Sequence, residues 1–358
     1  MNTQTHGGAR RFLLLLLVCL MLIGSAGCRG GSDVPLSAGL VMIEGVPVYD
    51  EDVALKTDHF TLTPGMMAYF FYTYGATVLS GLEAQKPFDE SKSLHGQMYN
   101  ETQSFYDVIM SETLSHVCYM LICCEAAYAE NVTLSEAERT QLEATVSSYR
   151  TQGAAEYGMQ LEAYLQALYG PLMTEQDLRA VLELEALASS FSATVSERLE
   201  AQITALQIED YMKEKGIEDD TPSRNLAFLY LPFENGAPAT QKIADVMGAM
   251  QSVPTPATLQ KAEHGTYGEQ EHMTPDNSGI AQITAWLFDE ARKVGDWGRV
   301  DVGGATYILI YTDNGMSYGE VQARSALFDL AFATWRNGWV ESLVFGYNYD
   351  CLDSYDFD

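Results

Sequence analysis

The chain has 358 residues, 47% of them hydrophobic, and carries 49 acidic against 20 basic residues, a net charge of −29. Its length suffices for two domains of ordinary size. The acidic charge repels phosphate backbones and anionic lipid surfaces, so we exclude nucleic acid as a partner. The same charge suits cationic or unfolded polypeptides.

The first 27 residues have the order of a secretory signal. Arg10 and Arg11 precede an unbroken apolar run, Phe12 to Ile23, after which four small residues lead to Cys28. The run is too short to span a bilayer well as a permanent helix. Two basic residues and no acidic ones lie in residues 1–27, so removal of this signal leaves a net charge of −31.

The cysteine after the small residues resembles the lipobox of bacterial lipoproteins, in which the thiol is acylated and becomes the first mature residue. Ser25 departs from the pattern, because the family usually has an apolar residue three positions before the cysteine. The resemblance implies lipid attachment at Cys28 and a flexible tether over residues 28–39. A plain secretory signal with an incidental cysteine is the alternative. No later apolar run reaches spanning length.

Residues 40–222 predict a helical domain after a short leader with strand-like runs at 40–43 and 46–49. Thr63 and Pro64 form a helix start, since a hydroxyl caps the helix and proline occupies its first position. Ser135 and Glu138 form a capping box. Helical periodicity predicts helices over 66–82, 101–129, 135–149, 161–168 and 174–215, the last with a break and with Gly216 as its cap.

Two features of this half could be structural or functional. The aromatic residues between Tyr69 and Tyr74 form either part of the core or an exposed binding surface. Cys118, Cys123 and Cys124 lie in one apolar helix, where buried packing is the favoured interpretation over a metal site with His116. A disulfide from Cys351 to this helix is left open.

The composition changes after a polar, proline-containing linker at 218–223. Residues 223–315 predict a compact α+β domain, with a strand at 225–231, helices at 240–251, 257–262 and 280–292, and a closing hairpin. The hairpin strands are 298–302 and 306–312, joined by Gly303 and Gly304. His264 and His272 lie in a polar, loop-like stretch and are predicted to be solvated. Residues 316–358 predict a helix packing on the helical domain and an acidic, frayed tail.

This order of elements resembles the extracytoplasmic foldases of the SurA and PrsA type. The resemblance rests on Leu134-Ser-Glu-Ala-Glu, on Tyr164-Leu-Gln-Ala-Leu-Tyr-Gly with Thr174 after it, and on the segment from Trp286 to Asp296. It implies an α+β, mostly helical fold in which a chaperone-like domain, built from both chain ends, holds an inserted parvulin-like domain. The parvulin family consists of peptidyl-prolyl cis-trans isomerases, also called rotamases.

The active-site pattern of parvulins is not retained. By resemblance, Asn225 stands where the family has a histidine in its first strand, and Tyr307 stands at the histidine of the last strand. The apolar Met and Phe that precede the third helix have no clear equivalents near Ile280 and Thr284. An apolar groove lined by Asn225, Trp286, Phe288 and Tyr307 is the predicted peptide-binding site. No motif for a metal, a cofactor or another catalytic reaction appears.

The sequence therefore predicts a folding factor of the cell envelope, anchored to the outer face of a bacterial cell membrane through a lipid. Its expected partners are unfolded exported polypeptides, and its isomerase activity is expected to be weak or absent. The alternative is a non-catalytic lipoprotein that binds a small solute or an envelope polymer. A homodimer is left open.

Overall fold

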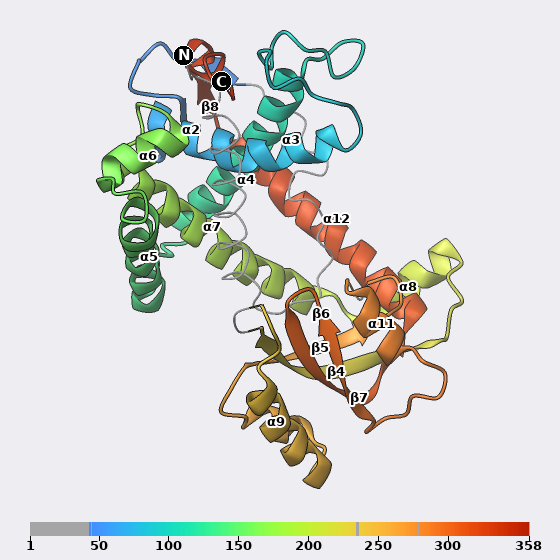
Figure 1. Cartoon of the computed structure of the whole chain (residues 1–358). Helices are drawn as coiled ribbons and strands as arrows, with labels where there is room; N and C mark the ends of the chain where they lie inside the picture. The colour runs from blue at the N-terminus through green and yellow to red at the C-terminus, as the bar shows by residue number, and fades with distance from the viewer. Residues whose placement is uncertain (1–42, 44, 234–235, 278, 358) are drawn as a thin grey trace. The chain divides into compact units, whose positions relative to one another are not determined.

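The computed structural model describes residues 43, 45–233, 236–277 and 279–357. The described chain divides into two compact units (Figure 1). Among the described residues, the helical unit combines those up to 200 with those from 331 onward, and the inserted unit covers those from 201 to 330. The predicted fold class is confirmed, since the helical unit is made from both chain ends and the α+β unit is inserted between them in the sequence. The signal, Cys28 and the tether lie outside the described residues.

The helical unit contains the helices that the capping signals predict. Its elements are α2 (Pro64–Phe70), η1 (Phe71–Gly75), α3 (Ala76–Glu83), α4 (Phe105–Ala129), α5 (Glu136–Ser148), η2 (Tyr149–Ala154), α6 (Leu161–Tyr169), α7 (Glu175–Gln202), the end of α12 (Tyr318–Ser342) and α13 (Tyr349–Leu352). Thr63 accepts a hydrogen bond from the Met66 amide at 3.1 Å, and Ser135 with Glu138 forms the predicted capping box. These local bonds satisfy amides that a helix start leaves unpaired.

The helix from residue 64 to 83 contains a π-helical turn, η1, between α2 and α3. Tyr69, Phe70 and Phe71 are at most 1% exposed, so this aromatic stripe belongs to the core and not to a binding surface. Gly75 lies on the π-helical turn, where an added Cβ would meet Ile109 of α4 at 2.9 Å. The close approach of two helices explains the glycine.

The central helix α4 is the one described helix that is long and apolar enough to cross a membrane, yet 72% of that stretch is buried inside the unit. Cys118, Cys123 and Cys124 are buried free thiols on it, and burial raises the pKa of Cys118 and Cys123 to about 12. Cys351 is also a free thiol. The packing interpretation of these cysteines is confirmed, because deeply buried thiols of this kind stay protonated and unreactive.

A small sheet joins the two chain ends within the helical unit. Its strands are β1 (Gly45–Pro47), β2 (Leu55–Lys56), β3 (Thr61–Leu62) and β8 (Phe345–Tyr347), in the order β1-β8-β2-β3. The predicted frayed tail is wrong. Leu352 and Tyr355 are buried, and the Tyr106 hydroxyl donates a hydrogen bond to the Leu352 carbonyl at 2.6 Å. The acidic composition is misleading because the apolar residues between the carboxylates insert into the core.

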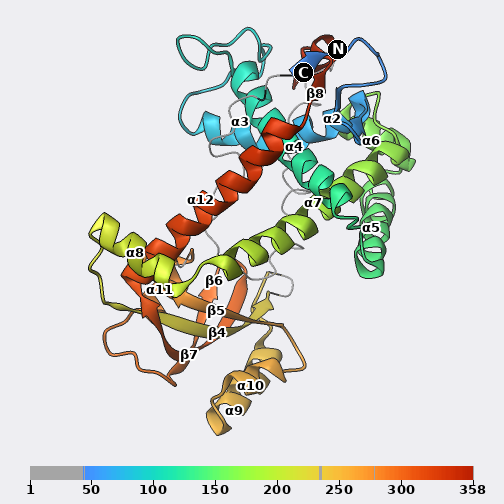
Figure 2. The same ribbon diagram turned by 180° about the vertical axis from the view of Figure 1, so that it is seen from behind.

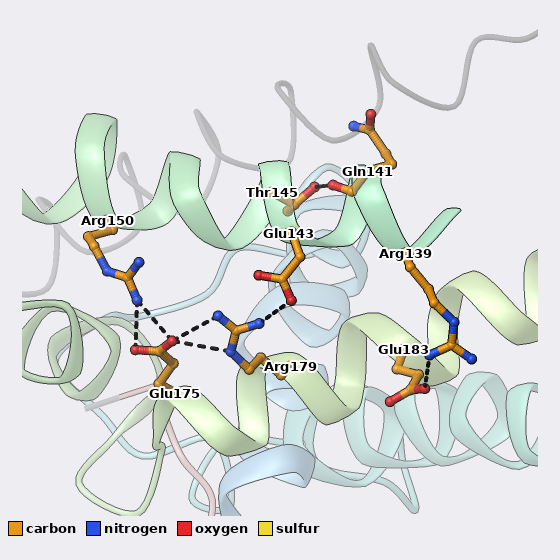
Figure 3. A network of polar contacts seen from close by, with 8 residues as sticks. All are labelled: Arg139, Gln141, Glu143, Thr145, Arg150, Glu175, Arg179 and Glu183. Carbon is orange, nitrogen blue, oxygen red and sulfur yellow. Dashed lines mark hydrogen bonds and ion pairs between the residues drawn. The ribbon is translucent and has the colours of Figure 1, made fainter. Parts of the chain in front are cut away.

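Ion pairs connect α5 and η2 to α7 on the surface of the helical unit (Figure 3). The Arg179 guanidinium lies between Glu143 of α5, at 2.5 Å, and Glu175, at 3.1 Å, and Arg150 of η2 also binds Glu175. Arg139 and Glu183 form a looser pair at 3.7 Å. A single exposed ion pair contributes little to stability. In a network, a side chain that is already held by one partner loses less conformational entropy when it binds a second.

The inserted unit is built on an antiparallel sheet. Its elements are α8 (Ala205–Lys215), β4 (Pro222–Pro232), α9 (Thr240–Ser252), α10 (Pro256–Gln260), β5 (Thr266–Met273), α11 (Ala281–Leu287), β6 (Trp297–Val302), β7 (Ala305–Ser317) and the start of α12. The sheet order is β5-β4-β7-β6. Gly303 and Gly304 form the predicted turn with φ values of 50° and 102°. A two-residue hairpin of this kind requires positive φ at both positions.

Two segments of this unit differ from expectation. The stretch predicted to be a loop is β5, a strand at the edge of the sheet whose mostly polar sequence lacks the apolar alternation that indicates a strand. The helix predicted over 280–292 ends at Leu287, where the Arg224 guanidinium donates hydrogen bonds to the carbonyls of Leu287 and Asp289.

Helices cover both faces of this sheet. On one face, α9 and α10 lie side by side and bury Ile243, Val246 and Leu259 against Leu229 and Ile308 (Figure 2). On the other face, the shorter helix α11 packs Ile283 and Leu287 against β4 and β7. Because α11 has only two turns, part of this second face remains uncovered by a helix.

Candidate functional site

The partly covered face of the sheet carries an aromatic patch, formed by Phe228, Tyr230 and Tyr307. Side chains of a strand alternate between faces, so Phe228 and Tyr230 of β4 project to the same side. Tyr230 pairs with Tyr307 of β7, and their ring centroids lie 5.3 Å apart in an edge-to-face arrangement. Phe228 is 8% exposed, whereas both tyrosines are half-buried. Phe228 belongs to the core cluster below, so the partly exposed portion of the patch consists of Tyr230 and Tyr307.

Trp286 of α11 is held rigidly at the border of this face. An added Cβ on Gly298 of β6 would meet the indole nitrogen at 2.6 Å, so the ring lies against the strand at a position where only glycine fits. The Arg292 guanidinium lies 4.2 Å from the ring centroid, and its Nε donates to the Trp286 carbonyl at 3.1 Å. This cation–π contact leaves little freedom for the indole to move.

Phe288 is positioned by a second arginine. The Arg224 guanidinium lies 5.3 Å from the Phe288 ring centroid and 5.2 Å from that of Tyr311, and it donates a hydrogen bond to the Leu287 carbonyl. An arginine between two aromatic faces favours planar stacking over an ion pair. Arg224 thus connects the end of α11 to β4 and β7.

Asn225 does not belong to the apolar face. Its side-chain amide donates to Asp313 at 2.6 Å, and its carbonyl accepts the His272 amide at 2.7 Å. The strand register pairs Asn225 with Asp313 but Tyr307 with Tyr230. Five residues of extended strand separate the two positions, about 16 Å, so they cannot share a hydrogen bond. The prediction that Asn225 lines an apolar groove is therefore not supported by its surroundings.

His272 is more constrained than a solvated surface residue. It is half-buried, has a φ of 55°, and its Nδ1 accepts a hydrogen bond from the Met316 amide at 3.2 Å. A ring nitrogen that accepts from an amide is unprotonated, which places the proton of the neutral imidazole on Nε2. Gly315 allows this approach, since an added Cβ would lie 2.4 Å from that ring nitrogen. His264, the other histidine predicted to be solvated, is also half-buried.

Three of the four predicted site residues thus gather around one apolar cluster. Trp286, Phe288 and Tyr307 all pack against it, whereas Asn225 joins the polar network beside β5. The prediction missed Phe228, Tyr230 and Arg224. The alternation of Leu226, Phe228 and Tyr230 along β4 was the available signal, since it places all three on one face.

A metal centre is not assembled in the described part of the chain, where no three His, Cys, Asp or Glu side chains group around one point. His116, which shares a helix face with Cys123, instead stacks on Tyr74 with ring centroids 4.4 Å apart. Burial lowers the pKa of His116 to about 4. Its environment is that of a neutral core residue.

Comparison with solved structures finds proteins of one kind. PrsA from Bacillus subtilis has 13% identity and a TM-score of 0.31, with 63% of this chain and 80% of that chain covered. The chain resembles PrsA- and SurA-type proteins. The PrsA foldase from Streptococcus pneumoniae has 13% identity and a TM-score of 0.26, over 71% and 91% of the two chains.

A third match comes from a structural study of PEB4 and Cj1289, two SurA-like chaperones of Campylobacter jejuni. The match has 9% identity and a TM-score of 0.22, with 85% of this chain and 96% of that chain covered. These matches are to proteins of the kind that the sequence resembles. No family model and no curated protein matches the sequence.

Proposed function

We propose that this protein is an extracytoplasmic folding factor that binds unfolded polypeptides and has weak or absent prolyl isomerase activity. One face of the sheet supports the proposal. It carries Phe228, Tyr230 and Tyr307, while Asn225 and Tyr307, which stand at the parvulin histidine positions by resemblance, lie too far apart in the strand register to act together. Aromatic surfaces bind extended, proline-rich chains without needing a catalytic group.

The chemistry of isomerisation agrees with a protein that binds polypeptides but isomerises proline weakly or not at all. The barrier of roughly 18–20 kcal/mol comes from the partial double bond of the amide, and an enzyme must stabilise the twisted state more than the ground state. Aromatic contacts hold both states about equally, so they favour binding over turnover. The Asn225 side chain already forms hydrogen bonds with Asp313 and with the His272 amide.

The location of the protein is part of the same proposal. The signal order of residues 1–27 and Cys28 support export and lipid attachment at the outer face of the membrane. Exported chains emerge there unfolded, and a net charge of −31 on the mature chain keeps an exposed apolar patch soluble. Mass spectrometry of the mature N-terminus tests the anchor directly.

The aromatic patch predicts a specific loss of client binding. The double substitution Tyr230→Ala with Tyr307→Ala should reduce suppression of aggregation of an unfolded client at least several-fold, since each aromatic contributes about 1 kcal/mol or more to contact. Light scattering of a denatured client during dilution measures this effect. Tyr49→Ala is the matched control, because Tyr49 is 84% exposed and lies in the helical unit. Unchanged suppression by the double variant would contradict the role of the patch.

The separated histidine positions predict poor catalysis. We expect cis-trans turnover of a proline-containing tetrapeptide to stay within about tenfold of the uncatalysed rate, because apolar contact alone stabilises the twisted amide little. A protease-coupled assay with an active parvulin as positive control measures it. Turnover comparable to the active parvulin would refute this half of the proposal.

A further inference from the structure

The end of α12 that belongs to the helical unit carries a cluster of large side chains on one helix face. Trp335 and Arg336 both lie three or four residues from Phe332 on one side and from Trp339 on the other, which places the four residues on one helix face. The three aromatic residues pack against the helical core while remaining partly exposed. The Phe332 ring lies 5.5 Å from Trp335 and 6.1 Å from Tyr119 of α4.

Arg336 is an exception among the arginines of the helical unit. Arg139, Arg150, Arg179 and Arg198 each form an ion pair with a glutamate. Arg336 is half-buried, and its Nε is a buried donor without a hydrogen-bond acceptor among the described residues. A buried donor left without an acceptor is costly and is uncommon in native proteins.

Tyr119 of α4 interacts with Arg336. The Tyr119 hydroxyl is hydrogen-bonded to Ser192 of α7 at 2.7 Å. Burial raises the pKa of Tyr119 well above its usual value, so the phenol remains uncharged. The chain carries 49 acidic residues, yet none in the described helical unit forms an ion pair with this guanidinium.

We propose that Arg336, flanked by Phe332, Trp335 and Trp339, binds a carboxylate carried by an apolar segment of a client polypeptide. This inference rests on the proposed function and names the chemical class of client segment that the helical unit selects. The guanidinium fork matches a carboxylate, and the aromatic side chains contact the apolar residues beside it. The net charge of the protein disfavours polyanions such as nucleic acids and anionic membranes, whereas a single carboxylate suffers less repulsion.

Three peptides of one apolar sequence test the site. The first has a central glutamate and an amidated end, the second has glutamine there and an amidated end, and the third has glutamine and a free C-terminal carboxylate. We expect the glutamate peptide, the free-carboxylate peptide or both to bind the wild type about tenfold more tightly than the neutral one, as for charge-assisted hydrogen bonds. The first and third peptides distinguish a side-chain carboxylate from a chain end.

The variants locate the effect. Arg336→Gln should remove the preference while keeping the affinity for the neutral peptide, and Arg336→Lys should retain part of it because the charge remains but the fork is lost. Arg198→Gln is the control, since it removes a paired arginine of the same unit. Thermal unfolding verifies that each variant is folded.

Calorimetric titration separates the two levels of the proposal. Equal affinity of wild type for all three peptides, or a preference that survives in Arg336→Gln, overturns the carboxylate site and leaves the polypeptide-binding function standing. Failure of all three peptides to bind overturns both.

Discussion

Deleting residues 349–358 is expected to unfold the helical unit rather than to trim a loose end. Leu352 and Tyr355 are buried, and the Phe357 ring stacks on Phe71 of η1 at a centroid distance of 5.0 Å. Burial of three such side chains contributes about 5 kcal/mol. This loss is comparable to the whole stability of an ordinary domain, about 5–15 kcal/mol.

The hydrogen bonds of this segment add to its effect. The Tyr355 hydroxyl donates to the Pro64 carbonyl at 2.8 Å, and the Tyr72 hydroxyl donates to the Asp356 carbonyl at 2.8 Å. Urea unfolding followed by circular dichroism measures the deletion. Tyr355→Phe, which removes one hydroxyl and keeps the ring, should cost only about 1 kcal/mol. A deletion that lowers the free energy of unfolding by less than about 1 kcal/mol would show that the tail is not part of the core.

Replacing Glu185 by glutamine is expected to stabilise the helical unit at pH 8 and to leave it little changed at pH 4. Glu185 of α7 lies beside buried tyrosines and accepts a hydrogen bond from the Tyr69 hydroxyl at 3.2 Å. Burial raises the pKa of its carboxyl from 4.5 to about 7. The folded protein therefore holds this proton more tightly than the unfolded chain does.

The sign of the pH dependence follows from this difference. Between pH 4.5 and 7 the folded state binds more protons than the unfolded state at this site, so its contribution makes stability fall as pH rises. Because the side chain is only half-buried, we expect a loss of about 1–3 kcal/mol across this range. Glu185→Gln abolishes that loss, since the neutral amide does not titrate.

Urea unfolding at pH 4, 6 and 8 checks this prediction by the difference between variant and wild type. The other titrating groups are common to both proteins and largely cancel. Glu183→Gln is the matched control, because Glu183 lies two residues earlier on α7, is exposed and pairs with Arg139. If Glu185→Gln and wild type show parallel pH profiles, the carboxyl is not perturbed as described.

Local chemistry explains why so many helix boundaries were predictable. The Thr63-Pro64 start, the Ser135–Glu138 capping box and the left-handed Gly216 cap depend on residues within one turn of each other. The hairpin at Gly303 and Gly304 is equally local. Such features require no knowledge of distant neighbours.

The sequence predicted that aromatic residues form the candidate site, but not which of them lie together. Trp286, Phe288 and Tyr307 were singled out by resemblance, yet Tyr230 becomes part of the patch only through its register with Tyr307. Register is set by pairing across the whole sheet, and a shift of one residue would turn Tyr230 to the opposite face. The sequence did not reveal that Asn225 lies outside the groove. Its polar partners are on β5 and β7, which are distant in the sequence.

The sequence by itself determined the order of elements, the division into a helical and an α+β part, and the identity of most core helices, because periodicity and capping act over a few residues. Only the tertiary structure decided that the acidic tail is buried, that β5 is a strand, and that Arg336 has no acidic partner in the described helical unit. Each of these depends on contacts between residues far apart in the chain. Such contacts leave no mark within a local window of sequence.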